Sequence, residues 1–152
     1  MRVLGIALLC LTTVVEAQSR AAEVLRSVGD STAVAQVVVR YHEALARDDT
    51  ATVLRLLAPT AVHVSDREIL TMADLRATGI AAHGRWERAI QRDNGTIHVR
   101  VSGNTAWAYW LWPMRARANP DLLKGREAEL LVLLRNGDTW QIAAIHASVG
   151  ES

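Results

Sequence analysis

The sequence predicts an α+β fold in which three helices pack on one face of a curved, mostly antiparallel sheet. Up to residue 84 the apolar residues recur at steps of three and four, and from there on they alternate as in strands. A block of helices followed by a block of strands is typical of an α+β layer fold. The clearest local signal lies in residues 125–148. Two apolar runs there flank Asn136-Gly137, a dipeptide that suits a tight hairpin turn because it tolerates positive φ.

The first seventeen residues are typical of an export signal. Arg2 precedes an apolar region from Val3 to Val15, and Val15-Glu16-Ala17 places compact residues ahead of a cleavage site before Gln18. As a helix this region spans about 20 Å, less than the roughly 30 Å core of a bilayer. We expect a signal peptide over 1–17, a linker or helical lead-in over 18–30, a folded domain over 31–150, and a periplasmic or extracellular location. An uncleaved anchor or a buried N-terminal helix is the alternative.

The composition narrows the classes of partner. The formal net charge of the 152 residues is +1, which gives no electrostatic footprint for nucleic acid or for a membrane surface after signal cleavage. The single cysteine, Cys10, lies within the signal, so the mature chain has no disulfide and no Cys-x-x-Cys zinc pattern. We also expect no cofactor, because no glycine-rich phosphate loop or nucleophile elbow is present.

Three helices are predicted in the first half of the chain. The first is capped by Asp30 or Ser31 and runs to about Asp48, because its apolar positions form one continuous stripe: Val34, Val37, Val38, Tyr41 and Leu45. The second begins at Asp49 or Thr50 and is stopped by Ala58-Pro59, since the residue before a proline disfavours the helical region. The third begins at Thr71, with Asp74 completing a capping box, and ends at Gly84.

The predicted strands cover residues 61–65, 85–92, 96–102 and 105–112, the last limited by Pro113, followed by the two strands of the hairpin. A loop over 116–124 leads into the hairpin. Both faces of the segments 107–112 and 128–134 are apolar, whereas a sheet covered by helices on one side should be polar on the other. We therefore expect a homodimer formed through the sheet. Coverage by the 113–124 loop or by the N-terminal segment is the alternative.

Three stretches carry a resemblance to a known superfamily. Residues 39–49 contain a Tyr-x-x-Ala-Leu-x-x-x-Asp pattern ending in Asp49, residues 56–62 read Leu-Leu-Ala-Pro-Thr-Ala-Val, and residues 140–148 read Trp-x-Ile-x-x-x-His-x-Ser. In order and spacing the chain resembles the nuclear transport factor 2-like superfamily, in its SnoaL-like branch. The resemblance implies a cone-shaped α+β barrel, a pocket between helices and sheet, and frequent dimerisation. It implies no single activity, because isomerases, cyclases, dehydratases and non-catalytic domains share the fold.

The ketosteroid isomerases of this superfamily suggest which residues to test. They use a helix-one tyrosine to donate a hydrogen bond to an oxyanion, an aspartate after the first strand to carry the proton, and a second, protonated aspartate. Tyr41 matches the tyrosine. The proton carrier falls on Ser65, one residue before Asp66, and the second aspartate falls near Leu131. One of three roles is filled, which argues against isomerisation of this particular kind. A core-edge aromatic that completes the helix stripe is the alternative for Tyr41.

Histidines supply the other candidates for chemistry. His146 shares strand parity with Trp140, Ile142 and Ser148, and could line the pocket mouth as a base or hydrogen-bond donor; a structural hydrogen bond at the barrel end is the alternative. His63 lies on a strand and is a further acid–base candidate. A metal site formed by His63, His98 and His146 is not expected, because no pair of them has a spacing that forces convergence.

Several other side chains are candidates for ligand contacts or for surface ion pairs. Tryptophans suit a flat apolar molecule and an inward arginine suits a carboxylate; these candidates are Trp86, Arg100, Trp110, Trp112 and Ser148. Arg88, Glu127 and Glu129 are expected to form cross-strand ion pairs on a solvated face, and such a pair is also the alternative for Arg100.

Three functions stay open from the sequence. The first is an exported module that binds a small apolar or carbonyl-containing molecule in a mostly apolar pocket. The second is a cofactor-free isomerase, cyclase or dehydratase that uses Tyr41, His63, Asp66 or His146 for acid–base chemistry. The third is an assembly domain with a vestigial pocket.

Overall fold

The computed structural model of the chain describes residues 27–65, 68–93, 95–119 and 123–151. The expected signal peptide, most of the expected linker, and Asp66 lie outside the described residues. Within the described ranges, no helix combines the length and apolar character needed to cross a bilayer.

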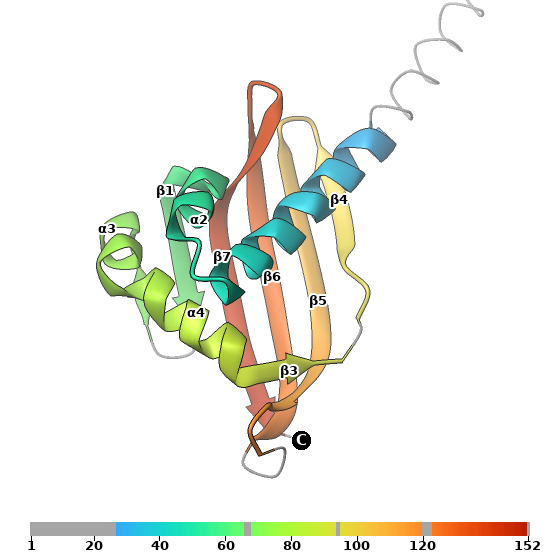
Figure 1. Ribbon diagram of the computed structural model, residues 1–152. Helices are drawn as coiled ribbons and strands as arrows, with labels where there is room; N and C mark the ends of the chain where they lie inside the picture. The colour runs from blue at the N-terminus through green and yellow to red at the C-terminus, as the bar shows by residue number, and fades with distance from the viewer. Residues whose placement is uncertain (1–26, 66–67, 94, 120–122, 152) are drawn as a thin grey trace, which may run out of the picture.

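One open, curved sheet of seven strands forms the centre of the molecule (Figure 1). The strands are β1 (Leu57–Ser65), β2 (Ile69–Leu70), β3 (Ile90–Arg92), β4 (His98–Ser102), β5 (Thr105–Ala116), β6 (Lys124–Asn136) and β7 (Thr139–Glu151). Their order is β2-β1-β7-β6-β5-β3, and β4 also pairs with β5. All pairs are antiparallel except β1–β7, which is parallel. The predicted α+β class is confirmed, although the sheet is not closed into a barrel.

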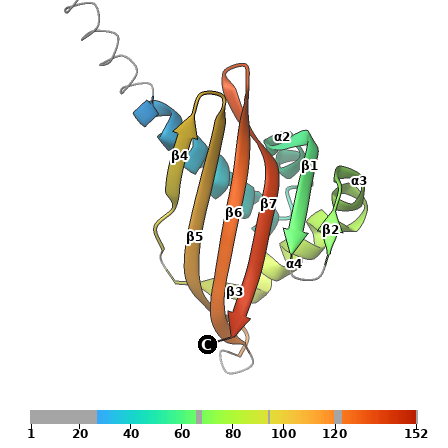
Figure 2. The same ribbon diagram turned by 180° about the vertical axis from the view of Figure 1, so that it is seen from behind.

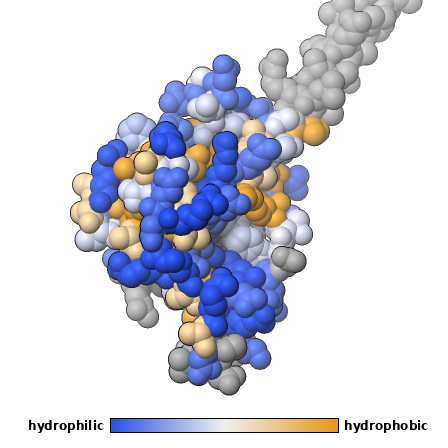
Figure 3. All heavy atoms as spheres, viewed as in Figure 1, coloured by the Kyte–Doolittle hydropathy of each residue, from blue (hydrophilic) through white to orange (hydrophobic). Residues whose placement is uncertain are grey.

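The helices lie together on the concave side of this sheet (Figure 1). A first helix covers residues 27–46. It is followed by α2 (Thr50–Leu56) and then by a continuous helical stretch of α3 (Met72–Asp74), a π-helical turn η1 (Leu75–Gly79) and α4 (Ile80–Ala89). The apolar stripe predicted for the first helix is buried against the inner face of the sheet, where it meets residues such as Leu131, Leu133 and Ile142. On the solvent side, hydrophilic residues cover most of the helices (Figure 3).

The caps of the second and third helices agree with those predicted from the sequence, because each depends on residues three positions apart. The Asp49 side chain accepts a hydrogen bond from the backbone N–H of Thr52 at 3.0 Å, and Thr71 with Asp74 forms the predicted capping box. The predicted cap at Asp30 or Ser31 is wrong, because helix already covers residues 27–30. Asp30 instead forms an ion pair with Arg135 of β6.

Pro59 and Pro113, which the sequence predicts to end a helix and a strand, both lie inside strands. Helix α2 ends at Leu56 and β1 begins at Leu57, so Pro59 belongs to the strand. The pairing of β1 with β7 is interrupted between Leu57 and Val62, which leaves Pro59 where no ladder hydrogen bond is needed. Pro113 does not end β5, because it pairs with Arg126 of β6 and the strand continues to Ala116.

Gly84 does not end the third helix as predicted. It is buried in the middle of α4, and residues 85–89 are helical, so only Ile90–Arg92 of the predicted 85–92 strand is extended. A Cβ atom on Gly84 would lie 2.9 Å from the carbonyl oxygen of Leu45 and 3.0 Å from Oδ1 of Asp48. The glycine therefore lets α4 approach the end of the first helix.

The close approach at Gly84 predicts that Gly84→Ala destabilises the fold, against the helix propensity of alanine. We expect a loss of about 1–3 kcal/mol, typical of overpacking. Gly29 is the matched control, because it also lies in a helix but a Cβ there meets nothing within 4 Å. Gly29→Ala should raise stability by up to about 1 kcal/mol. Urea unfolding of both variants tests this, and a stabilised Gly84→Ala protein would contradict it.

The C-terminal hairpin is confirmed, with one shift in its turn. Asn136 pairs with Thr139, so the two turn residues are Gly137 and Asp138 rather than Asn136 and Gly137. Gly137 has φ of 60°, the left-handed conformation that the turn requires.

A bulge in β7 changes which of its side chains face inward. Val132 pairs with Ala144 and Leu133 with Ile142, so Ala143 is an extra residue. One extra residue reverses the alternation beyond it. Accordingly Trp140, Ile142 and then Ile145 are buried, whereas His146 is exposed. The predicted shared parity of His146 with Trp140 is wrong for this reason.

The outer face of the sheet carries exposed apolar side chains. Viewed from behind, β4, β5, β6 and β7 have no described element over them (Figure 2). The exposed residues on this face include Trp107, Tyr109, Leu111, Leu130 and Leu134, with between 37% and 54% of each surface accessible. This matches the predicted apolar character of both faces of β5 and β6.

Candidate functional site

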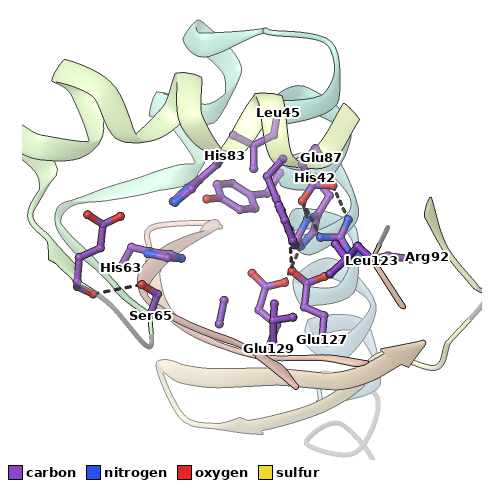
Figure 4. A pocket seen from close by; sticks show the side chains of 15 residues that line it. His42, Leu45, His63, Ser65, His83, Glu87, Arg92, Leu123, Glu127 and Glu129 are labelled. Atoms are coloured by element: carbon purple, nitrogen blue, oxygen red, sulfur yellow. Dashed lines mark hydrogen bonds and ion pairs between the residues drawn. The ribbon is translucent and has the colours of Figure 1, made fainter. Parts of the chain in front are cut away.

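A cavity of about 540 Å³ lies between the helices and the inner face of the sheet (Figure 4). The first helix contributes Tyr41, His42 and Leu45, and α4 contributes His83, Trp86 and Glu87. The sheet and its connections contribute the remaining lining residues, which are His63, Ser65, Glu68, Arg92, Leu123, Glu127, Glu129, Ala147 and Val149. The expected apolar walls are present, together with a charged cluster that the sequence did not predict.

Two glutamates of β6 point into this cavity. Glu127 and Glu129 alternate in phase with Leu131 and Leu133, which fill the core, and they remain only 4% and 7% exposed. The expectation that they belong to a solvated face is wrong. Beyond Glu129 the inner face of the sheet opens from the packed core into the cavity, so the same strand phase that buries the leucines directs these carboxylates into the site.

Arg92 holds two of the carboxylates together. Its Nε donates to Glu127, and its two Nη atoms donate to both oxygens of Glu87, with Nη2 lying 3.0 Å from Oε1. The second oxygen of Glu127 accepts a hydrogen bond from Nε1 of Trp86 at 3.2 Å. The Arg92 guanidinium also lies 5.5 Å from the centre of the Trp112 ring. This fork-shaped pairing fixes the Glu87 and Glu127 side chains.

His42 joins the third carboxylate to this cluster. Its Nδ1 lies 3.0 Å from Oε1 of Glu87, and its Nε2 lies 3.3 Å from Oε2 of Glu129. Burial alone would lower the pKa of His42, but the Glu129 and Glu87 carboxylates outweigh it and raise the pKa to about 10. Burial likewise opposes ionisation of Glu87, yet His42 and Arg92 lower its pKa to about 2. The imidazolium and the Glu87 carboxylate are therefore both charged at neutral pH.

Tyr41 keeps its proton in this setting. Its side chain is 2% exposed, and burial, with the Glu129 and Glu87 charges, raises the pKa of its hydroxyl far above the ordinary value. The hydroxyl makes no hydrogen bond to another described residue, so it is available to donate one to a bound molecule.

Two histidines on the other side of the cavity are neutral. The rings of His63 and His83 lie 4.3 Å apart between their centres. Burial, followed by the neighbouring His83 and His146, lowers the pKa of His63 to about 4, and burial also lowers the pKa of His83. Nδ1 of His63 is buried with no hydrogen-bond partner in the described part of the chain. The pair can accept protons where the His42 cluster cannot.

The structure brings together only part of the site that the sequence predicted. Tyr41, His63 and Trp86 line the cavity. Trp110 is buried in the core, and Trp112 packs on Trp110 and near Arg92 beside the site.

Three further candidates lie on the outer face of the sheet: Arg100, His146 and Ser148. Their pairing partners there, Trp107, Leu130 and Ala128, are also on that face. His98 is on the outer face too, so its imidazole and that of His146 do not converge with His63. In the described part of the chain no three metal-binding side chains form a cluster. Arg88 pairs with Asp48 at the surface.

Some of the site residues that were not predicted can be recognised in the sequence by their phase with buried residues. His42 occupies a stripe position four residues after Val38 and three before Leu45, and the two β6 glutamates are in phase with buried leucines. A charged residue in phase with a buried face marks a polar site within the core. His83 and Glu87 show no such signal, because the sequence predicts a helix end and a strand where the structure has the continuous helix α4. Arg92 lies on a strand as predicted, but the three residues of β3 are too few to show a phase.

The family follows from comparison with known proteins. The sequence pattern of the SnoaL-like domain matches residues 34–151, and the chain belongs to this family, within the nuclear transport factor 2-like superfamily. No curated protein matches the chain by sequence.

Solved structures confirm the fold. A candidate ketosteroid isomerase from Shewanella frigidimarina is similar with a TM-score of 0.67 and 18% identity, over 74% of this chain and 92% of that one. A candidate dehydratase of the NTF2-like family from Streptomyces avermitilis gives 0.64 and 21%, over 82% and 98%. An NTF2-like protein with a cystatin-like fold from Novosphingobium aromaticivorans gives 0.69 and 15%, over 86% and 88%.

Proposed function

We propose that the cavity binds a small carbonyl-containing molecule and moves a proton on it by side-chain acid–base chemistry, as an isomerase, cyclase or dehydratase would. One observation carries the proposal: a protonated hydroxyl, on Tyr41, and a neutral imidazole, on His63, line the same cavity without hydrogen bonds to other described residues. The similarity to a candidate isomerase and a candidate dehydratase supports the same class of reaction.

The proposed step is proton transfer next to a carbonyl. His63 takes a proton from the carbon beside the carbonyl, and the electron pair of that C–H bond moves to give an enolate. The enolate oxygen accepts a hydrogen bond from Tyr41, which stabilises the developing charge. His83, in ring contact with His63, can receive the proton before it returns to carbon or to a leaving hydroxyl.

Exchange of hydrogen for deuterium tests this step. Small ketones such as cyclohexanone and 2-tetralone are incubated with the protein in D₂O, and loss of the α-proton signal is followed by NMR. We expect His63→Asn to reduce exchange to the background rate and Tyr41→Phe to slow it by about 10²–10³-fold. His98→Asn, on the outer face, should leave it unchanged. Ketones that bind without exchange would favour a binding module instead and overturn the proposal.

The acid limit of the exchange rate provides a second check. Because the pKa of His63 is about 4, the base is unprotonated above that pH. The rate should therefore be insensitive to this group from pH 7 to pH 5 and should fall below pH 4.

We propose that the outer face of the sheet forms a homodimer. The exposed apolar residues of β5 and β6 support this, since such contiguous surfaces mark interfaces. Leu130→Glu should give a monomer in sedimentation at micromolar concentration. Val39→Glu, at an exposed apolar site on the first helix, is the matched control and should stay dimeric. A wild-type monomer would contradict the proposal.

We also propose that the chain is exported and cleaved before Gln18, on the basis of the charged and apolar pattern at its start. N-terminal sequencing of the protein from its native host tests this, and an intact Met1 in the purified protein would rule it out.

A further inference from the structure

We propose that the cavity selects molecules that carry a protonated amine, with Glu129 as the group that accepts the N–H. This inference takes the ligand site of the proposed function and adds the chemical class of the ligand. It does not depend on whether a proton is then transferred.

The cavity has an excess of negative charge. Among the described lining residues, four carry carboxylates, namely Glu68, Glu87, Glu127 and Glu129, whereas two, His42 and Arg92, supply positive charge. His63 and His83 do not offset this excess, because burial keeps them neutral. A ligand with a carboxylate or phosphate would add to the repulsion, and one with an ammonium group would reduce it.

Glu129 is the carboxylate whose hydrogen bonding is incomplete. Glu87 and Glu127 have both oxygens engaged by Arg92, His42 or Trp86. Glu129 is 7% exposed, and its nearest charged partner, Nε2 of His42 at 3.3 Å, is not aligned as a hydrogen bond; both atoms lack a hydrogen-bond partner in the described ranges. Figure 4 shows the Glu129 side chain directed into the cavity. A buried carboxylate with unused acceptors favours a charged N–H donor.

The walls beside Glu129 suit an ammonium group as well. Tyr41 and Trp86 both line the cavity and present aromatic rings, which attract cations by their quadrupole. The cavity is also lined by Leu45, Leu123 and Val149, whose apolar side chains can contact the hydrocarbon part of a ligand. The fitting ligand is thus a small amine with an apolar skeleton.

An isosteric series distinguishes charge from shape. Benzylamine, benzyl alcohol and benzoate are similar in size and differ in charge, and their binding to the full chain is measured by calorimetry at pH 7. We expect benzylamine to bind at least about tenfold more tightly than benzyl alcohol, and benzoate not to bind. This preference should weaken as salt is raised, since screening reduces charge contacts. Equal binding of benzylamine and benzyl alcohol would overturn the inference.

Variants assign the preference to Glu129. Glu129→Gln keeps the shape and removes the charge, so it should bring the affinity for benzylamine close to that for benzyl alcohol. Glu43→Gln, at an exposed ion pair on the first helix, is the control and should keep the preference. If Glu129→Gln does not fold, Glu68→Gln at the cavity rim should still reduce the preference, and an unchanged preference there would contradict the charge argument.

The two proposals fail separately. Amine selectivity without ketone exchange leaves this inference intact and removes the proton-transfer function. Exchange that depends on His63, without amine selectivity, supports the proton-transfer function and removes this inference.

Discussion

Replacing Arg92 with leucine is expected to lower the free energy of unfolding by about 3–5 kcal/mol, because a buried ion pair that loses one partner leaves an uncompensated charge. Here the substitution leaves two buried carboxylates, those of Glu87 and Glu127, without the guanidinium that they bind. The side chains of Arg92, Glu87 and Glu127 are 13%, 9% and 5% exposed. Without the guanidinium, and among the described residues, Glu127 retains only the N–H of Trp86 and Glu87 retains only His42. With a total stability of about 5–15 kcal/mol for a typical domain, this loss brings the variant close to unfolding.

Urea unfolding measures this effect against a matched exposed arginine. Arg47 pairs with Glu43 at 3.3 Å, but the two side chains are 65% and 52% exposed. Arg47→Leu should cost less than about 1 kcal/mol. Arg92→Lys should fall between the two, since it keeps a charge but not the two-pronged geometry. A loss at Arg92 no greater than that at Arg47 would show that the cluster does not stabilise the fold.

The charged His42 predicts a pH-dependent stability that decreases towards alkaline pH. Its pKa rises from 6.5 to about 10 on folding, so its stabilising effect is complete below pH 6.5 and is lost as the pH rises through about 10. The slope approaches about 1.4 kcal/mol per pH unit within this window. The pKa of Glu87 falls from 4.5 to about 2, so its contribution is complete above pH 4.5 and is lost towards pH 2. The cluster is therefore most stabilising between about pH 4.5 and 6.5.

The comparison of wild type with His42→Gln isolates the histidine from other titrating groups. The difference in unfolding free energy between the two proteins should be largest at pH 6 and should shrink by about 2 kcal/mol or more at pH 9. The measurement is urea unfolding at both pH values. A difference that is constant or grows with pH would mean that His42 is neutral in the folded protein.

Sequence reasoning succeeded where the signal is local. The first-helix stripe, the Asp49 cap, the Thr71 capping box and the hairpin near Gly137 depend on residues a few positions apart, and each is confirmed. The family resemblance is confirmed as well, because it rests on the order of such local patterns.

It failed where a distant contact decides the local structure. Gly84 reads as a helix end, yet its missing side chain serves the packing of α4 on the first helix. Pro59 and Pro113 read as breaks, yet the sheet places them where they do not interrupt it. The bulge at Ala143 has no signature in composition, and it alone moved His146 out of the predicted site.

The same bulge decides which side chains of the last strand the cavity receives. If Ala143 paired with Val132 as a regular strand residue, every later residue of β7 would slip by one position along β6. Ala147 and Val149, which now line the cavity, would turn outward, and His146 and Ser148 would turn in. A slip of one residue would thus exchange two apolar lining residues for a basic and a hydroxyl side chain without any substitution. Deleting Ala143, in contrast, would remove the bulge and keep the present facing, because Ala144 already pairs with Val132. The register of β7 is therefore a determinant of the chemistry of the site in its own right.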